Sequence, residues 1–338
     1  MFDNQRPGVY SRYDITGFYG LAPGARDAAV VLSGGGAQSG VLHSFSSYAE
    51  ALSAFGGNAP LSEALRLLFA GGAGKVHAAV AGGDYAGAFS LLEGVDTGAL
   101  VCDCREPDDL AALREFLEKS AERQRECIAF LGIGDPEEAI AAAEVLNCER
   151  AAICCPAVDT GEAAPSAVFA ACALAGRVLA APNPIYNLSG DSFELLYGAQ
   201  SLPEETVQRL LRAGVCVFEE TGGEVELIRA LTTRASTAGA ADYSLRSLNT
   251  VLIIDDVMRS IRLCLRRRLK GTGAVSASGI RDQITVELAE KADAGIISDF
   301  APPKVAPDKS DPAVCVVALS FSAAHLPSRI HITAHVRV

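Results

Sequence analysis

Short apolar runs alternate with amphipathic stretches along most of the chain. The apolar runs cover residues 28–32, 75–80, 99–103, 127–133, 151–156 and 215–219. Runs of this length without polar alternation are typical of strands that are buried on both faces. We therefore expect these runs to form a sheet that is covered on both sides.

Helix start signals lie between the apolar runs. Pro107, Pro136 and Pro203 are each followed by acidic residues that suit the positive end of a helix. Gly214 is placed to end the third of these helices. The alternation predicts an α/β fold with a mostly parallel sheet covered by helices.

The pattern changes after residue 219. Residues 225–231 form a further strand that we expect to pair back as a hairpin, and 240–298 is rich in helix signals. The proline-rich segment 301–312 is expected to be a loop, and strands are predicted at 313–322 and 329–338. This part therefore reads as a smaller α+β C-terminal domain.

These changes divide the chain into four expected parts. They are an extended N-terminal arm at 1–27, an α/β domain at 28–234, a C-terminal domain at 235–325 and a terminal arm strand at 326–338. A basic helix at 257–270 belongs to the C-terminal domain.

Composition narrows the class of protein. The chain has 338 residues, 49% of them hydrophobic, so it can build a large core. Its net charge of −12 argues against general nucleic-acid binding. No apolar run reaches the roughly 18 residues of a membrane span, and the first residues lack the apolar core of a signal peptide, so we expect no export route. The ten cysteines include no CxxC pair and lie mostly in apolar stretches, which predicts reduced, buried thiols.

Two glycine-rich segments are candidate nucleotide sites. Residues 71–76 (GGAGKV) lack the first glycine and the hydroxyl residue of a phosphate-binding P-loop. Residues 33–40 (SGGGAQSG) follow a strand but lack clear G-x-G-x-x-G spacing. A soluble α/β enzyme that binds a nucleotide or a phosphorylated metabolite at 33–40 stays open as the alternative.

Three aspartates and one serine are considered as residues of a ligand site or of a protease site. Asp103, Asp135 and Asp159 follow strands, where ligands bind in open α/β sheets, although Asp is also a preferred helix cap. Asp159-Thr160-Gly161 and Ser166 faintly resemble subtilisin segments, but no histidine is placed as a base. A protease is therefore not favoured.

The predicted basic helix carries a one-sided stripe. Asp255 and Asp256 suit its start, and six basic residues without an acid follow between 257 and 270. At 100° per residue, four of them fall within an arc of roughly 80°. They are Arg259, Arg262, Arg266 and Lys270. Because a solvated face usually mixes signs, this stripe favours contact with an acidic surface.

The chain ends on a strand pattern. Arg329, His331, Thr333, His335 and Arg337 alternate with apolar residues up to residue 338. Ten extended residues span about 33 Å, which is long for a tail without a following turn. An ordinary edge strand of the C-terminal domain and an arm that joins a neighbour's sheet both fit, and we favour the exchanged arm.

Several segments, taken in their order, resemble the contractile tail sheath proteins of phage tails and R-type tailocins, which are contractile bacteriocins. They are RPGVY, LFAGGAGKVHAAV with the ALVCD strand, APNPIYNLSGD, LLRAGVCVFEETGGEVELIRALTTR and SLNTVLIIDDVMRSIR. The length resembles that of a compact sheath without the added outward domains of larger relatives. The resemblance implies a subtilisin-like α/β domain without catalytic activity.

The resemblance also implies how such a subunit works. Hexameric rings would stack helically around an inner tube, and contraction from a metastable extended state would drive the tube through a target cell envelope. The basic helix would contact the acidic tube through Arg259, Arg262, Arg266 and Lys270. Terminal arms would interlock subunits by β-augmentation, through Val9, Tyr10, Arg12, Tyr13, Ile15, Ile330, Ile332, Ala334, Val336 and Val338.

The implied partners are other copies of the chain, the inner tail tube protein, and baseplate and tail terminator proteins. No cofactor, metal, direct nucleic acid contact or membrane is implied. The resemblance places assembly in the bacterial cytoplasm, before the subunit becomes part of a released virion tail or tailocin particle.

Overall fold

A computed structural model describes residues 27–34, 39–56, 59–237, 240–242, 244–269, 276–311 and 314–324. Both predicted arm strands, at 9–15 and 329–338, lie outside the described residues, as does Lys270. The predictions made for them therefore stay predictions.

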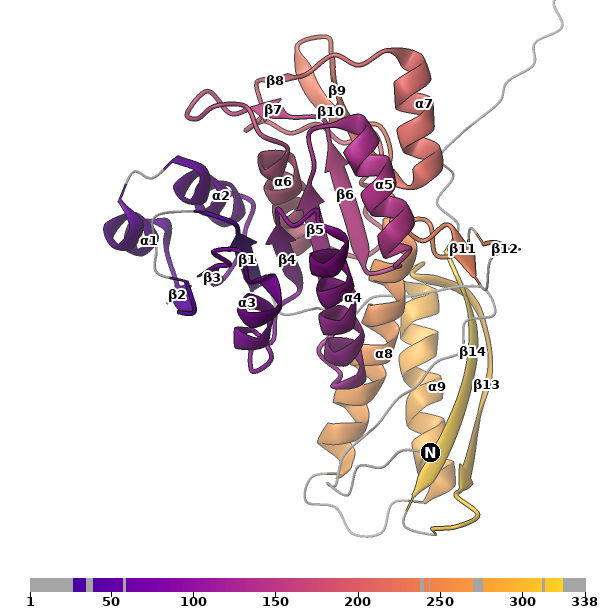
Figure 1. Cartoon of the computed structure of the whole chain (residues 1–338). Helices are drawn as coiled ribbons and strands as arrows, with labels where there is room; N and C mark the ends of the chain where they lie inside the picture. Colours follow the sequence, from indigo (N-terminus) through magenta and orange to yellow (C-terminus); the bar gives the residue numbers. More distant parts are fainter. Residues whose placement is uncertain are drawn as a thin grey trace, which may run out of the picture.

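An eight-stranded sheet forms the centre of the molecule (Figure 1). Its order is β10-β9-β6-β5-β4-β1-β3-β2. The parallel strands are β1 (Ala28–Leu32), β3 (Val76–Val80), β4 (Ala99–Cys102), β5 (Ile128–Gly132), β6 (Ala151–Cys155) and β9 (Val215–Thr221). The two edge strands, β2 (His43–Phe45) and β10 (Glu224–Leu227), pair antiparallel with their neighbours. The predicted fold class is confirmed, because each predicted apolar run coincides with a strand of this sheet.

Helices cover both faces of the sheet (Figure 1). Neighbouring helices α3, α4, α5 and α7 pack in sequence on one another, and α2 packs on α1 and α6. Their bounds are α1 (Tyr48–Phe55), α2 (Ala59–Ala70), α3 (Tyr85–Leu91), α4 (Pro107–Glu122), α5 (Pro136–Leu146), α6 (Ala167–Ala180) and α7 (Glu204–Ala213). The predicted starts at Pro107 and Pro136 are confirmed, and Gly214 ends α7 with a φ of 90°.

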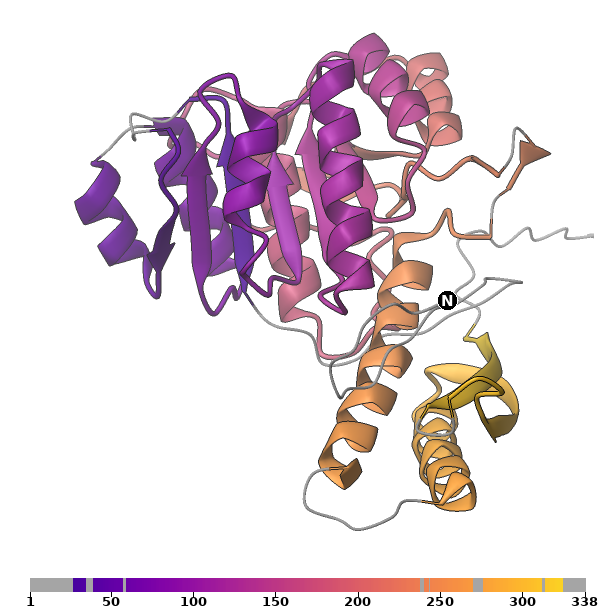
Figure 2. The same cartoon turned by 60° about the horizontal axis from the view of Figure 1, so that its bottom comes forward.

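The C-terminal part consists of two long helices and a hairpin. Helix α8 (Leu248–Leu269) runs away from the sheet and packs beside α9 (Ala277–Asp293), as Figures 1 and 2 show. Strands β13 (Ile297–Pro307) and β14 (Cys315–Ala323) form an antiparallel hairpin that lies on α9. Four two-residue strands complete the description: β7 (Val158–Asp159), β8 (Gly198–Ala199), β11 (Ser236–Thr237) and β12 (Ala240–Ala241).

The loop predicted at 301–312 is wrong over its first half. Residues 301–307 belong to β13. The register shifts between Ala301 and Lys304, so Pro302 and Pro303 lie in a bulge opposite β14. An edge strand tolerates proline at a bulge or where the missing N–H would face away from the ladder. A proline-rich composition therefore did not exclude a strand here.

Two hydrophobic clusters share helix α8. Val251, Leu252 and Met258 belong to the large cluster that surrounds the sheet. Val257 and Ile261 belong to the smaller cluster formed with α9 and the hairpin. Because α8 contributes to both clusters, it joins the C-terminal part to the α/β body. Within the described ranges, no helix is long and apolar enough to cross a membrane.

Helices α2 and α6 meet at a pair of glycines. A Cβ atom added at Gly71, just beyond α2, would lie 2.6 Å from the Cα atom of Gly176. A Cβ atom added at Gly176 would lie 2.9 Å from the Cα atom of Gly71. The backbones therefore approach too closely for any side chain.

We expect Gly176→Ala to lower the free energy of unfolding by about 2 kcal/mol, because the added methyl group forces the backbones apart. Gly94→Ala is the matched control, since nothing lies within 4 Å of its added Cβ. Urea unfolding of both variants measures the difference. Equal stability of the two variants would contradict the close packing.

Candidate assembly interface

Helix α8 begins earlier than the sequence predicts. It starts at Leu248, so Asp255 and Asp256 lie in its interior rather than at its first turn. Both carboxylates are buried, at 3% and 2% exposure. The expectation that they begin the helix is therefore wrong, and their role is to form ion pairs within the subunit.

Asp255 joins α8 to the amino end of β6. Arg150, the residue before β6, donates two hydrogen bonds to the Asp255 carboxylate, at 2.7 and 2.8 Å. Both side chains are about 95% buried. The bidentate geometry satisfies both charges in the interior.

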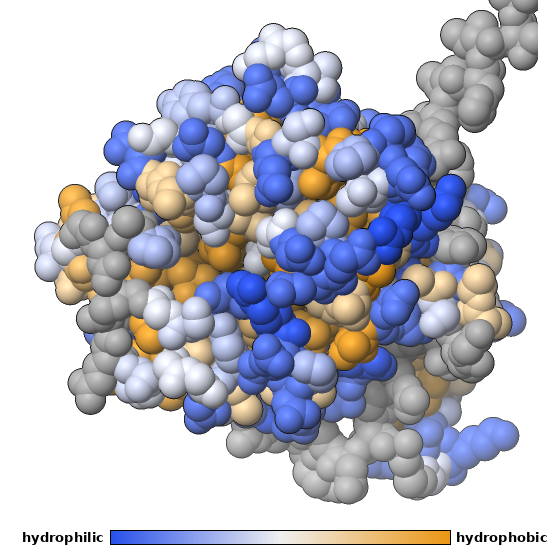
Figure 3. Space-filling view, turned by 45° about the horizontal axis from the view of Figure 1, so that its top comes forward, coloured by the Kyte–Doolittle hydropathy of each residue, from blue (hydrophilic) through white to orange (hydrophobic). Residues whose placement is uncertain are grey.

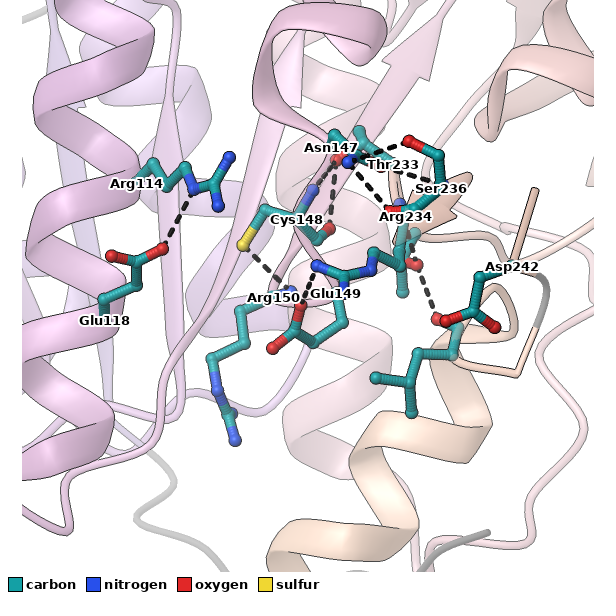
Figure 4. Close-up of polar contacts among 12 residues, drawn as sticks. Arg114, Glu118, Asn147, Cys148, Glu149, Arg150, Thr233, Arg234, Ser236 and Asp242 are labelled. Atoms are coloured by element: carbon teal, nitrogen blue, oxygen red, sulfur yellow. Dashed lines mark hydrogen bonds and ion pairs between the residues drawn. The ribbon is translucent and has the colours of Figure 1, made fainter. Parts of the chain in front are cut away.

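Residues 233–236, which precede α8, contact the residues between α5 and the amino end of β6 (Figure 4). Asn147 ends α5 in a left-handed conformation, and its amide group bonds Ser236 and the backbone N–H of Ala235. The Thr233 hydroxyl donates to the Cys148 carbonyl oxygen at 3.0 Å. These contacts hold the segment that leads into α8 against the end of α5 and the start of β6.

Glu126 joins α8 to the amino end of β5. Its side chain is 2% exposed and lies 2.6 Å from the Arg262 guanidinium and 3.4 Å from that of Arg259. Arg259 also donates to the Glu126 carbonyl oxygen. Burial by itself raises the pKa of this carboxyl, but the Arg262 hydrogen bond and the two positive charges hold the pKa below its usual value.

Asp256 joins α8 to α9. Lys291 on α9 donates a hydrogen bond to its carboxylate. Burial raises the pKa of Asp256 to about 7, and the Lys291 contact offsets only part of that shift. This carboxyl therefore titrates near neutral pH while it is buried.

The basic residues predicted to form one exposed stripe differ in their burial. Arg262 is buried at 4% exposure, and Arg259 is mostly buried against Glu126. Arg266 is exposed and donates to the Gln124 amide oxygen, while the neighbouring Arg267 is also exposed. The acidic partner of Arg259 and Arg262 is thus an acid of the same chain. Contact of the four residues with a tube remains a prediction.

Glu126, Arg150 and Lys291 were missed in the sequence. The available signal was a charged residue next to an apolar strand, as in Arg125-Glu126-Cys127 and Glu149-Arg150-Ala151. Such residues are rarely fully buried unless they are paired. The pattern does not say which distant charge is the partner.

The hairpin β13–β14 presents two strand edges. Within the described residues, neither edge is paired with a further strand. Val316 on β14 is 49% exposed, and Val314 just before β14 is 45% exposed. A shallow groove of about 670 Å³ lies along Pro302, Pro303 and Val305, with Arg281 of α9 at its side.

The structure adds no support for the alternative nucleotide site at 33–40. Residues 35–38 lie outside the described ranges. The backbone N–H and hydroxyl of Ser33 donate to the Asp103 carboxylate, which also accepts from the Tyr85 hydroxyl. A phosphate would meet a negative charge at this edge of the sheet.

The surroundings of that edge are polar and acidic. Hydrophilic side chains dominate the end of the body seen in Figure 3, with apolar side chains between them. Glu219, Glu220 and Glu224 are exposed on the β9–β10 hairpin at this end. They lie four or five strands from β1 in the sheet order, so the Asp103 carboxylate is the acidic group beside the 33–40 segment.

The other candidate residues have structural roles. Asp135 accepts from the N–H groups of Glu137 and Glu138 and caps α5, and Ser166 caps α6. Asp159 accepts from the N–H of Gly161 in a turn. In the part of the chain that the structure describes, no group of three or more His, Cys, Asp or Glu side chains could hold a metal ion.

None of the ten cysteines, all of which lie in the described ranges, forms a disulfide, and eight of them are buried. Burial raises the pKa of Cys127 and of Cys148 to about 11. These thiols are therefore protonated at neutral pH and act as small apolar side chains.

Comparison with solved structures identifies proteins with this fold. A chain of the anti-feeding prophage (AFP) baseplate superposes with a TM-score of 0.72 at 14% identity, over 99% of this chain and all of that one. A chain of the AFP helical sheath in its contracted state gives 0.70 at 15% identity, over 98% and 99% of the two chains. The sheath tail protein Lin1278 of Listeria innocua gives 0.70 at 11% identity, over 91% and 93%.

These likenesses extend over nearly the whole chain. The protein therefore has the fold of contractile tail sheath proteins. The sequence matches no known family model and no curated protein sequence.

The shared carboxylate of Glu126 supplies a direct test. We expect Glu126→Gln to lower the free energy of unfolding by about 3 kcal/mol, because it removes the carboxylate that faces Arg259 and Arg262 of α8 in the interior. Glu118→Gln is the matched control, since it breaks the exposed Arg114–Glu118 pair. That change should be far smaller. Urea unfolding that shows similar losses for both variants would contradict the role of the buried pair.

Asp256 predicts a pH dependence. Because its folded pKa of about 7 exceeds the unfolded value of about 4, the folded state holds the proton more tightly. Its contribution is fully present below pH 4 and is lost as the pH rises through 7. Asp256→Asn removes this titration, so wild type should lose on the order of 4 kcal/mol relative to the variant between pH 4 and pH 8. Chemical unfolding at several pH values measures the difference, and a constant difference would contradict the raised pKa.

Proposed function

We propose that the protein is a structural subunit of a contractile tail sheath. The observation that carries this proposal is the likeness over nearly the full chain to sheath tail proteins and to the AFP sheath in its contracted state. The shared fold includes both the α/β body and the C-terminal part. An enzymatic role has no support from the described residues around the 33–40 segment.

In this proposal the subunits form six-membered rings that stack helically around an inner tube. A helical stack requires heterologous contacts that do not close on themselves. Strands exchanged between copies meet this need, because β-augmentation joins subunits through backbone hydrogen bonds. We assign the joints to the arm residues Val9–Ile15 and 329–338, and the acceptor to the β13–β14 hairpin.

The buried ion pairs give the subunit a rigid centre. Contraction then moves the bodies as units around their strand joints. The extended state is held kinetically, and the contracted state has the stronger contacts between subunits. This movement drives the tube through a target cell envelope.

The tube contact is assigned mainly to the exposed end of α8. Arg266 is exposed there, and Lys270 follows in the sequence. Arg259 and Arg262 could reach a tube only by leaving Glu126, which would strand a buried carboxylate at a cost of about 3–5 kcal/mol. A single exposed ion pair contributes little free energy. Many such pairs together can hold the sheath on the tube, and they can break one after another during contraction.

The proposal also defines partners and location. The partners are other copies, an inner tube protein, and baseplate and terminator proteins, with no cofactor. Assembly takes place in the bacterial cytoplasm, and the subunit leaves as part of a tail or tailocin particle.

Deletion of residues 329–338 tests the proposal. We expect the full chain, concentrated alone or with a tube protein, to form striated tubes in negative-stain electron microscopy. The deletion variant should stay folded but lose the tubes, because its joint is missing. Circular dichroism and thermal unfolding check that the α/β body is intact.

Two results would count against this account. Tubes from the deletion variant would remove the C-terminal strand as a joint. A full chain that stays a small uniform particle even with a tube protein would contradict the sheath role.

A further inference from the structure

An exposed aromatic side chain lies at the carboxyl end of the sheet. Tyr197, the residue before β8, is 66% exposed, more than any other large apolar side chain among the described residues. Its backbone N–H donates to the Asp159 carbonyl oxygen at 2.8 Å. Its ring lies over Gly161, because a Cβ atom added there would come within 3.2 Å of the ring. The ring is therefore held in its exposed position before a partner binds, which lowers the entropic cost of binding.

Acidic side chains lie beside this ring. A Cβ atom added at Gly198 of β8, the residue after Tyr197, would lie 3.7 Å from Oε2 of Glu220. Glu219 and Glu224 are exposed on the same β9–β10 hairpin. We call Tyr197 and these three glutamates the Tyr197 surface. An aromatic side chain with charged neighbours is typical of the centre and rim of a protein interface.

The groove on the β13–β14 hairpin lies on a face of the hairpin. Lys304 and Ala306 of β13 line it together with Val316 and Ala318 of β14. The residues that alternate with them belong to the smaller core beside α9. Because the side chains of a strand alternate between its two faces, these four residues face away from α9. A contact in the groove therefore differs from strand pairing at the edges of the hairpin.

The residues of the groove suit an aromatic side chain with acidic neighbours. Pro302 and Pro303 line it, and proline rings pack well on aromatic rings. Arg281 and Lys304 are both exposed, and neither forms an ion pair with another described residue. An arginine can also stack on an aromatic face. The groove thus combines apolar contact area with two positive charges that await a partner.

The Tyr197 surface and the groove lie at opposite ends of the molecule. Strands β8, β9 and β10 lie at one end, and the turn end of the β13–β14 hairpin lies at the other (Figure 1). Arg281 follows the start of α9 at that second end. One subunit therefore cannot bring its own two surfaces together, whereas two copies can.

We propose that the Tyr197 surface of one copy docks in the groove of a second copy, with the Tyr197 ring against Pro302 and Pro303 and the glutamates beside Arg281 and Lys304. This inference rests on the proposed sheath function and adds a contact between copies besides the terminal strands. Because the two surfaces differ and lie at opposite ends, the contact is heterologous and can repeat without closing.

Carbodiimide cross-linking of the full chain tests the contact. This reagent joins a lysine amine to a carboxylate as an amide with loss of one water, so it reports direct ion pairs. We expect peptides that join Lys304 to Glu219, Glu220 or Glu224 in tubes. In a mixture of copies with natural and heavy nitrogen, these peptides should contain one half of each kind.

The other outcomes overturn the inference. Tubes in which Lys304 links only to other residues, or to the tube protein, would remove the second copy as the occupant and leave the sheath proposal standing. Links within one copy in dilute single subunits would exclude a contact between copies. A chain that forms no tubes, alone or on a tube protein, would contradict both proposals.

Variants of Tyr197 give an independent test. We expect Tyr197→Ala to raise the critical concentration for tubes about tenfold or more, because it removes the anchor of the contact. Tyr197→Phe keeps the ring and should change it little. Val145→Ala is the matched control, since Val145 is 47% exposed on α5 and has no part in the contact. Equal critical concentrations for Tyr197→Ala and Val145→Ala, with both variants folded by circular dichroism, would overturn the inference.

A charge exchange tests which residues meet. Glu220→Lys and Lys304→Glu should each raise the critical concentration about threefold to tenfold, because each places like charges together. Both changes in one chain restore opposite charges across the contact, so the critical concentration should return toward that of wild type. A double variant whose loss is the sum of the two single losses would overturn the pairing of these surfaces.

Discussion

The arrangement of the molecule depends on one buried carboxylate that two arginines share. Glu126 lies at the amino end of β5, and Arg259 and Arg262 lie on α8. Without its partners, each of these charges would be strongly destabilising in the interior. Together with the Arg150–Asp255 pair, this contact fixes the direction in which α8 leaves the sheet. The direction of α8 in turn sets where α9 and the hairpin lie.

Helix α8 holds the α/β body and the β13–β14 hairpin in one rigid unit. The helix contributes apolar residues to both hydrophobic clusters, so the body and the hairpin cannot move apart without exposing both. In the proposed sheath, movement during contraction would then take place at the joints between copies.

The sequence was sufficient for elements whose signals are local. Buried strands are continuous apolar runs, and the starts at Pro107 and Pro136 are set by the residues next to them. The basic stripe was more difficult, because its partner Glu126 is 133 residues away from Arg259 along the chain. Helical periodicity shows that side chains share a face but not what covers that face. Likewise, Pro302 and Pro303 indicate a break in regular structure, and only the register shows that the break is a bulge within a strand.

A cryo-electron microscopy reconstruction of the assembled tubes at side-chain resolution tests the central claim most directly. The account predicts that Arg262 stays on Glu126 inside each subunit. A map in which Arg262 leaves Glu126 to contact a tube or a neighbouring subunit would contradict it.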